Sequence, residues 1–306
     1  MSTTNHGDYF IPEPSKWPIV GTVALTTTVI GAVNTIHSMQ AGGSMSLLLP
    51  IGLLLIAYLF FGWFGAVIEE SMAGNYNEQV DRSFRIGMLW FIFSEVMFFA
   101  AFFGALFYAR VFALDWLAGG SNNAMTHELL WPGFEGVWPL ITNPDNAAFT
   151  GPQQSMGPSG LPAINTAILL LSSVTVTIAH HALRQDHRKP LILWLAATVA
   201  LGVIFLFFQV EEYVHAYKEM GRTLDSGIYG STFFMLTGFH GFHVTMGTTM
   251  LLVMLIRAIK GHFTSDNHFA FEAVAWYWHF VDVVWLGLFI FVSVSYTHLT
   301  LPTIQL

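Results

Sequence analysis

The chain has 306 residues, of which 54% are hydrophobic and only 10% are charged. A typical soluble domain carries about 25% charged residues, so the composition excludes an ordinary soluble fold. The chain contains 0 cysteines, which excludes disulfides, iron–sulfur clusters and thiolate-bound metals. The net charge of −8 argues against a nucleic-acid partner.

Seven apolar stretches are close to the roughly 20 residues that a helix needs to cross a bilayer. We place them at residues 17–37, 46–68, 86–110, 161–181, 190–210, 230–256 and 271–295. The first stretch contains the hydroxyl residues Thr26 to Thr28. A membrane helix tolerates them because a hydroxyl can bond back to a carbonyl of its own helix. The sequence therefore predicts an all-α, polytopic membrane protein.

The Lys and Arg residues are divided unevenly between the two sides of these spans. If the N-terminus is inside, the inner segments hold 8 of them and the outer segments hold 3, which together are all 11. The positive-inside rule then predicts an inner N-terminus and an outer C-terminus. The long outer loop 111–160 is rich in Gly, Pro and Asn. It is a candidate linker between a two- or three-helix part and a four-helix part.

Ionisable side chains inside the spans are few, and burying each in a bilayer costs a few kcal/mol or more. Those that we single out, inside the spans or at their ends, are Glu95, His180, His181, Glu211, Glu212, His240, His243, His279 and Asp282. Glu212-x-x-His215 has the spacing of one half of a di-iron carboxylate site, but such a site needs a second E-x-x-H, which the chain lacks. A lone His240-x-x-His243 is also too small a ligand set. We therefore expect no metal site in this chain.

Paired histidines on facing helices could instead hold a haem. We place His240 and His243 about a third of the way into the sixth span, and His279 about a third of the way into the seventh. Because the two spans run antiparallel, we expect the depths to differ and haem ligation to fail. Hydrogen bonds between helices are the favoured role for all three. His279 and Asp282, three residues apart, are spaced for pairing on one helix face.

Glu95 is a single carboxyl in the apolar run 86–108. Burial favours the neutral, protonated form of a carboxyl unless a base lies near it. Ala100-x-x-x-Gly104 belongs to a ridge of small residues suited to close helix contact. The residues alone leave two roles open: a neutral, hydrogen-bonded side chain, or a titrating group in a proton path.

Several segments together resemble subunit III of cytochrome c oxidase. They are RIGMLWFIFSEVMFF (85–99), SSVTVTIAHHAL (172–183), DSGIYGSTFF (225–234), STFFMLTGFHGFHVTMGT (231–248) and HFTSDNHFAFEAVAWYWHFVDVVWL (262–286). The resemblance extends from about Phe10 to about Phe291. Segments of this length, in this order, do not arise by chance.

The resemblance implies seven helices in a two-plus-five arrangement around a lipid-filled cleft. It implies a core subunit of the proton-pumping cytochrome c oxidase of aerobic respiration, in direct contact with catalytic subunit I and in one complex with subunit II. Haem and copper would lie in the partner subunits, and this chain would bind phospholipids only. Its role would be to stabilise the catalytic subunit and support proton uptake. A quinol oxidase is the alternative, and an independent di-iron membrane enzyme is a remote one.

The resemblance also implies roles for single residues, none of them catalytic. Glu95 matches the family's buried glutamate in an S-E-V motif that faces the lipid cleft. Trp63 matches an aromatic residue near bound lipid, and Arg257 matches a basic residue at a lipid head group on the inner side. The polar residues expected to be structural are His240, His243, His279 and Asp282.

The chain departs from the family pattern in two places. Many relatives have Trp-Arg-Asp where this chain has Phe64-Gly65-Ala66, which weakens the case for a head-group contact there. The segment SVSYTHLTLPTIQL matches nothing in the family, so we predict one membrane domain over 1–292 and an artefactual tail over 293–306. The long loop 111–160 resembles bacterial members. It favours a bacterial inner (plasma) membrane, with the mitochondrial inner membrane as the alternative.

Overall fold

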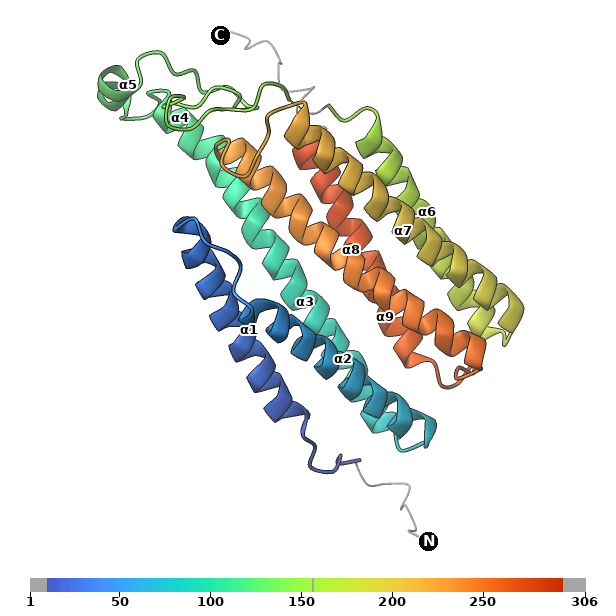
Figure 1. The fold of residues 1–306 in the computed structure, drawn as a ribbon. Helices are drawn as coiled ribbons and strands as arrows, with labels where there is room; N and C mark the ends of the chain where they lie inside the picture. The colour runs from blue at the N-terminus through green and yellow to red at the C-terminus, as the bar shows by residue number, and fades with distance from the viewer. Residues whose placement is uncertain (1–9, 156, 294–306) are drawn as a thin grey trace. The chain divides into compact units, whose positions relative to one another are not determined.

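The computed structural model describes residues 10–155 and 157–293. Within these ranges the chain is helical and has no strand, and 7 helices are long and apolar enough to cross a membrane (Figure 1). They are α1 (Trp17–Gln40), α2 (Leu48–Met72), α3 (Glu78–Tyr108), α6 (Leu161–Arg184), α7 (Arg188–Lys218), α8 (Ile228–Lys260) and α9 (Phe269–Leu288). The predicted all-α class and the predicted spans are confirmed. The largest boundary differences are that α3 begins at Glu78 rather than at residue 86, and that α7 continues to Lys218 rather than ending at 210.

The chain divides into two compact units, Met1–Ile86 and Gly87–Leu306. The first unit holds α1, α2 and the start of α3, and the second holds the rest of α3 and α6 to α9. The division therefore falls inside α3, and the prediction that loop 111–160 links two parts of the molecule is wrong. Most of the predicted tail, residues 294–306, lies outside the described residues.

The loop 111–160 fails as a linker because it is tied to the second unit. It begins as a helical continuation of α3, a π-helical turn (Ala109–Ala113) followed by α4 (Leu114–Leu117), and later contains α5 (Ala124–Leu130). Further along, the Asn143 side-chain amide donates to the carbonyl of Ser226 (3.3 Å). A small apolar cluster completes the attachment; it consists of Leu114, Phe134, Leu140 and Tyr229.

In the first unit, α1 and α2 form a hairpin whose helices approach closely at glycines. A Cβ added to Gly31 would lie 2.6 Å from the Cα of Leu49, and one added to Gly52 would lie 2.6 Å from the Cα of Thr28. Any side chain at either glycine would therefore separate the two backbones. Small residues at such crossings are typical of helix pairs in membranes.

The hydroxyls of α1 bond within their own helix, as expected. Thr27 Oγ1 donates to the Val23 carbonyl and Thr28 Oγ1 to the Ala24 carbonyl, both at 2.8 Å. The hydroxyl groups are thereby satisfied without a partner on another helix.

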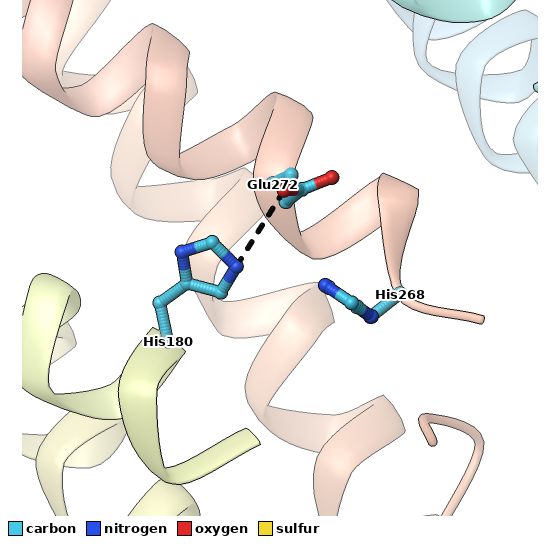
Figure 2. Close-up of side chains that lie close together, drawn as sticks. All are labelled: His180, His268 and Glu272. Atoms are coloured by element: carbon cyan, nitrogen blue, oxygen red, sulfur yellow. Dashed lines mark ion pairs between the residues drawn. The ribbon is translucent and has the colours of Figure 1, made fainter. Parts of the chain in front are cut away.

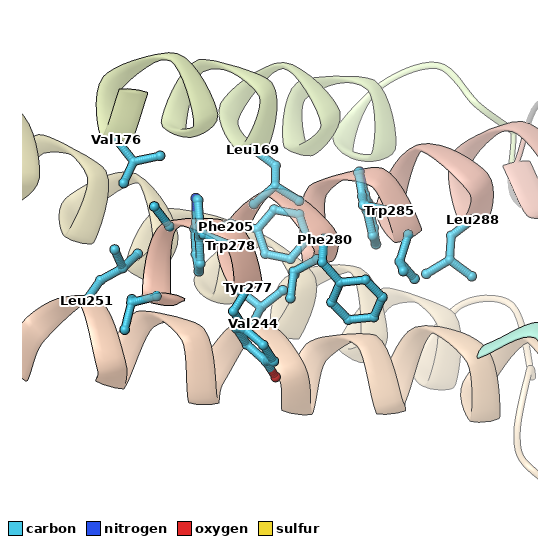
Figure 3. Close-up of a cluster of buried hydrophobic side chains, with 14 of the residues drawn as sticks. Leu169, Val176, Phe205, Val244, Leu251, Tyr277, Trp278, Phe280, Trp285 and Leu288 are labelled. Carbon is cyan, nitrogen blue, oxygen red and sulfur yellow. The ribbon is translucent and has the colours of Figure 1, made fainter. Parts of the chain in front are cut away.

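In the second unit, α6 to α9 form a ring of contacts: α7 packs against α6 and α8, and α9 packs against α6 and α8 (Figure 1). The core between them contains Leu169, Val176, Phe205 and Trp278, each fully buried (Figure 3). Polar side chains also join these helices. Trp278 Nε1 donates to Ser172 Oγ at 2.9 Å.

From residue 87 on, α3 packs against α8 and α9 through aromatic side chains. The ring centroids of Phe98 and Phe239 lie 5.1 Å apart, and those of Phe99 and Phe280 lie 6.1 Å apart. The predicted small-residue ridge is not used within this unit, because a Cβ on Gly104 would meet nothing within 4 Å. The opposite, phenylalanine-rich face of α3 fills the contact instead.

Candidate functional site

Glu95 and His243 form an interhelical pair between α3 and α8. The distance from His243 Nε2 to Glu95 Oε2 is 2.9 Å. The His243 side chain is 8% exposed and that of Glu95 is 22% exposed, so water has little access to the bond. The base that the sequence could not assign to Glu95 is therefore a histidine 148 positions away.

The second ring nitrogen of His243 restricts where protons can sit. His243 Nδ1 lies 2.7 Å from the Phe239 carbonyl oxygen. A carbonyl only accepts, so Nδ1 carries a hydrogen. If the ring is neutral, Nε2 then has a lone pair, and Glu95 must be protonated in order to donate to it. If Nε2 also carries a hydrogen, the pair is an imidazolium and a carboxylate. The neutral and the charged form of Glu95 thus differ only in whether one proton sits on Glu95 or on His243 Nε2.

Aromatic rings surround this pair. The His243 ring lies 5.0 Å from the Phe99 ring, 5.9 Å from the Phe98 ring and 6.4 Å from the Tyr277 ring, measured between centroids. The Tyr277 contact is a stacked one. The arrangement holds the imidazole in one orientation and keeps the short hydrogen bond in an apolar setting, where such bonds are strong.

His240 and His279 lie at similar depths, so the reason given against haem ligation was wrong. His240 Nε2 lies 3.1 Å from the Val281 carbonyl, which places it level with the middle of α9. The histidines differ in the helix that each side chain faces. His279 Nε2 lies 3.4 Å from Thr177 Oγ1 of α6, whereas His243 faces α3. Each histidine has its own partner on another helix, and the structural role expected for them stays a prediction.

Asp282 is buried (6% exposed) on α9, one turn beyond His279. Its Oδ1 has no hydrogen-bond partner among the described residues, and no hydrogen bond joins it to His279 there. Asp282 and His279 nevertheless act on each other electrostatically, so the predicted pairing on one helix face is made through charge and not through a hydrogen bond.

Glu212 and His215, the E-x-x-H of α7, point to different surroundings. Glu212 is buried (6% exposed), and it acts electrostatically on Arg222. His215 Nδ1 instead pairs with Glu219 at 2.9 Å on the exposed surface. The two side chains do not share a site. Burial lowers the pKa of the Arg222 guanidinium, and the nearby carboxylate of Glu212 opposes that shift.

The two predicted lipid residues lie in different units. Trp63 of α2 is 48% exposed. Arg257 of α8 is 7% exposed, and its guanidinium carbon lies 4.6 Å from the centre of the Phe263 ring. Of the remaining ionisable residues in the spans, His181 and Glu211 are exposed. His180 lies near Glu272.

These observations define a class of protein: a polytopic helical membrane protein in which several buried polar side chains bond between helices. The comparisons with known proteins are specific. Residues 7–120 and 145–297 match the family described as Cytochrome c oxidase subunit III. The match extends past residue 293, so the first residues of the predicted tail lie inside the family's range.

Curated relatives give the same result. The chain is 41% identical to Cytochrome c oxidase subunit 3 of Arabidopsis thaliana over 293 residues, 95% of this chain and 97% of that protein. It is 40% identical to Cytochrome c oxidase subunit 3 of Sus scrofa over 283 residues, 92% of this chain and 95% of that protein. The chain belongs to the cytochrome c oxidase subunit III family, whose members are subunits of an oxidoreductase complex. The quinol oxidase alternative is not favoured.

Proposed function

We propose that this chain is a core subunit of a proton-pumping cytochrome c oxidase that carries no redox centre of its own. It packs directly against catalytic subunit I, in one complex with subunit II, and the haem and copper lie in those partners. The observation that carries the proposal is the 41% identity to a cytochrome c oxidase subunit 3 over 95% of the chain, together with the family match over residues 7–120 and 145–297. Its role is to stabilise the catalytic subunit and to support proton uptake.

The Glu95–His243 pair supports the second half of this role. It offers one proton that can sit on either side of a bond whose Nε2–Oε2 distance is 2.9 Å, in an apolar part of the bundle. Transfer of the proton between Glu95 and His243 keeps the pair neutral. A proton given to a partner path leaves a net charge of −1 on the pair, so it has to be replaced from that path.

The test replaces Glu95 in the assembled oxidase. In Glu95→Gln the side-chain amide can still donate to His243 Nε2, so the contact between α3 and α8 is kept while the carboxyl proton is lost. We expect normal assembly and an initial turnover within about twofold of the wild type, less than about 0.5 kcal/mol of barrier. Inactivation during turnover should accelerate toward that of oxidase depleted of this subunit.

A matched control is Ser94→Ala on the same helix, because Ser94 Oγ bonds back to the Phe91 carbonyl and to no other helix among the described residues. This variant should inactivate at the wild-type rate. Complete loss of initial turnover in Glu95→Gln would contradict the proposal and assign obligatory chemistry to the carboxyl. Equal inactivation rates in wild type and Glu95→Gln would remove the pair from proton supply.

Phospholipid is the proposed ligand of Trp63 and Arg257. The guanidinium of Arg257 can make a charge-assisted contact to a phosphate. Because Arg257 is only 7% exposed, a phosphate can reach only a small part of its side chain. Arg257→Ala should reduce the phospholipid that copurifies with the complex, measured by mass spectrometry of the extracted lipid. Unchanged lipid content would contradict this role.

The proposed location is a bacterial inner (plasma) membrane, with a cytoplasmic N-terminus and a periplasmic C-terminus. The bases Arg184, Arg188, Arg257 and Lys260 support this orientation, because they gather at the ends of α6, α7 and α8 that lie on one side of the membrane. Because the chain has 0 cysteines, one cysteine introduced into the α2–α3 turn can be labelled from either side of sealed vesicles. Labelling only from the periplasmic side would reverse the assignment.

A further inference from the structure

Three possible metal ligands meet where α6 ends and α9 begins. His180 comes from the last turns of α6, His268 directly precedes α9, and Glu272 lies in the first turn of α9. One ligand atom from each lies within 4.8 Å of the others. Figure 2 shows the rings of His180 and His268 directed toward one another, with the carboxylate of Glu272 beside them.

Each of the two histidines has one ring nitrogen that makes no hydrogen bond within the described ranges. His180 Nε2 and His268 Nδ1 are buried atoms without a partner there. The distance from His180 Nε2 to Glu272 Oε1 is 3.7 Å, too long for a hydrogen bond. His268 stands at the cap position of α9, but its side chain makes no capping bond. A buried ring nitrogen that lacks a partner is unusual, and that of His180 faces Glu272 and His268 (Figure 2).

We propose that His180, His268 and Glu272 form a binding site for a divalent transition-metal ion, with zinc as the best fit. Two imidazoles and one carboxylate, with a fourth position open to water, are a donor set that zinc accepts in tetrahedral geometry. Imidazole also suits copper and nickel, so the choice of metal rests on geometry and supply.

Only a small movement is needed to form the site. Zinc–ligand distances of about 2.0–2.2 Å put neighbouring ligand atoms of a tetrahedron about 3.4 Å apart. The present 3.7 Å between His180 and Glu272 is close to that value, and the largest separation is below 4.8 Å. Rotation of the side chains closes this gap. The side chains of His180 and Glu272 are 25% and 17% exposed, which leaves an entry path.

The charges around the site set its affinity. Arg184 and His181 act on His180 as positive neighbours, whereas Glu272 acts as a negative one. Since both imidazoles bind metal only when neutral, binding should weaken as the pH falls. A bound ion would connect the C-terminal end of α6 to the segment that enters α9.

The direct test soaks zinc into crystals of the intact, chelator-treated oxidase complex. We expect an anomalous difference peak, taken across the zinc absorption edge, between the three side chains. This measurement needs no variant, so it does not depend on how a mutant folds. Absence of a peak there at zinc excess would overturn the proposal.

Equilibrium dialysis of the intact complex with zinc alone gives the second measurement. His268→Gln and Glu272→Gln should each weaken one zinc site at least tenfold, about 1.4 kcal/mol. The matched control is His181→Gln, which removes an exposed histidine next to His180 that lies outside the cluster. Retention of the same zinc sites in His268→Gln as in the control would show that surface histidines, not this cluster, bind the metal.

Discussion

The α1–α2 hairpin and the four helices α6 to α9 are held together in different ways. We compare α2 with α9. The mean hydropathy is higher in α2, yet only 11% of its most apolar window is buried, against 56% in the span that contains α9. A soluble protein would show the opposite order, because there apolar side chains drive burial. In a bilayer the lipid tails are as apolar as Leu, so the more apolar of these two helices does not need protein contacts to cover its side chains.

The contacts themselves differ in the same sense. The hairpin joins backbones at Gly31 and Gly52 and satisfies its hydroxyls locally. The four-helix part connects helices through side chains, as in the bond from Trp285 Nε1 to Thr166 Oγ1 (2.9 Å). Polar residues that bond between helices therefore indicate packing against protein, whereas hydroxyls that bond within their own helix, as in α1, do not.

The largest expected effect breaks the hairpin. In Gly52→Val the new side chain meets the backbone of Thr28, which cannot rotate away, so the helices must separate. We expect a loss of roughly 1–3 kcal/mol in stability, measured as a lower temperature of thermal release of this subunit from the complex.

Gly65→Val is the control for that change, because it adds the same side chain to the same helix where nothing lies within 4 Å. It should leave the release temperature near that of the wild type. If both variants lowered it equally, the effect would come from valine in α2 and not from the close approach.

A smaller effect is expected from removing one hydrogen bond in the four-helix part, which can be compared with removing one in the α1–α2 hairpin. Ser172→Ala removes the acceptor of the Trp278 indole N–H and leaves a buried donor unpaired. We expect a loss of about 1 kcal/mol, near the upper range for single interhelical bonds in membranes. Thermal denaturation of the complex, followed for this subunit, gives the value.

Thr27→Val provides the counterpart in the hairpin. Its hydroxyl donates only to Val23 in the same helix, so its removal should change stability by less than about 0.5 kcal/mol. A Thr27→Val cost equal to that of Ser172→Ala would show that bonds within and between helices count alike, and the contrast between the two regions would fail.

Much of the fold could be predicted from the sequence, because span length and composition respond to bilayer thickness alone. The seven spans and the hydroxyl bonding of α1 belong to this part. The position of the division between units could not be predicted. Loop 111–160 has the composition of a linker, and its bonds to the α7–α8 connection, such as that of Asn143 to Ser226, depend on distant residues.

The candidate site shows the same limit. Glu95 was singled out by its cost in a bilayer, but its partner depends on how α3 and α8 are rotated about their axes, which no local pattern records. The prediction that His279 and His240 lie at different depths failed for a related reason. It required the offset between two antiparallel helices along their axes. His268 was missed as a possible ligand because it precedes the predicted span, so only the structure brings it to His180.

The hydrogen bond from His243 to the Phe239 carbonyl has an electrostatic consequence. With Nδ1 always protonated, moving the remaining proton across the bond between His243 and Glu95 leaves the net charge of the pair at zero and reverses only its dipole. A monopole in an apolar medium would cost far more than a dipole of this size. The bundle can therefore respond to a charge that arrives in a neighbouring subunit while itself remaining uncharged at this position.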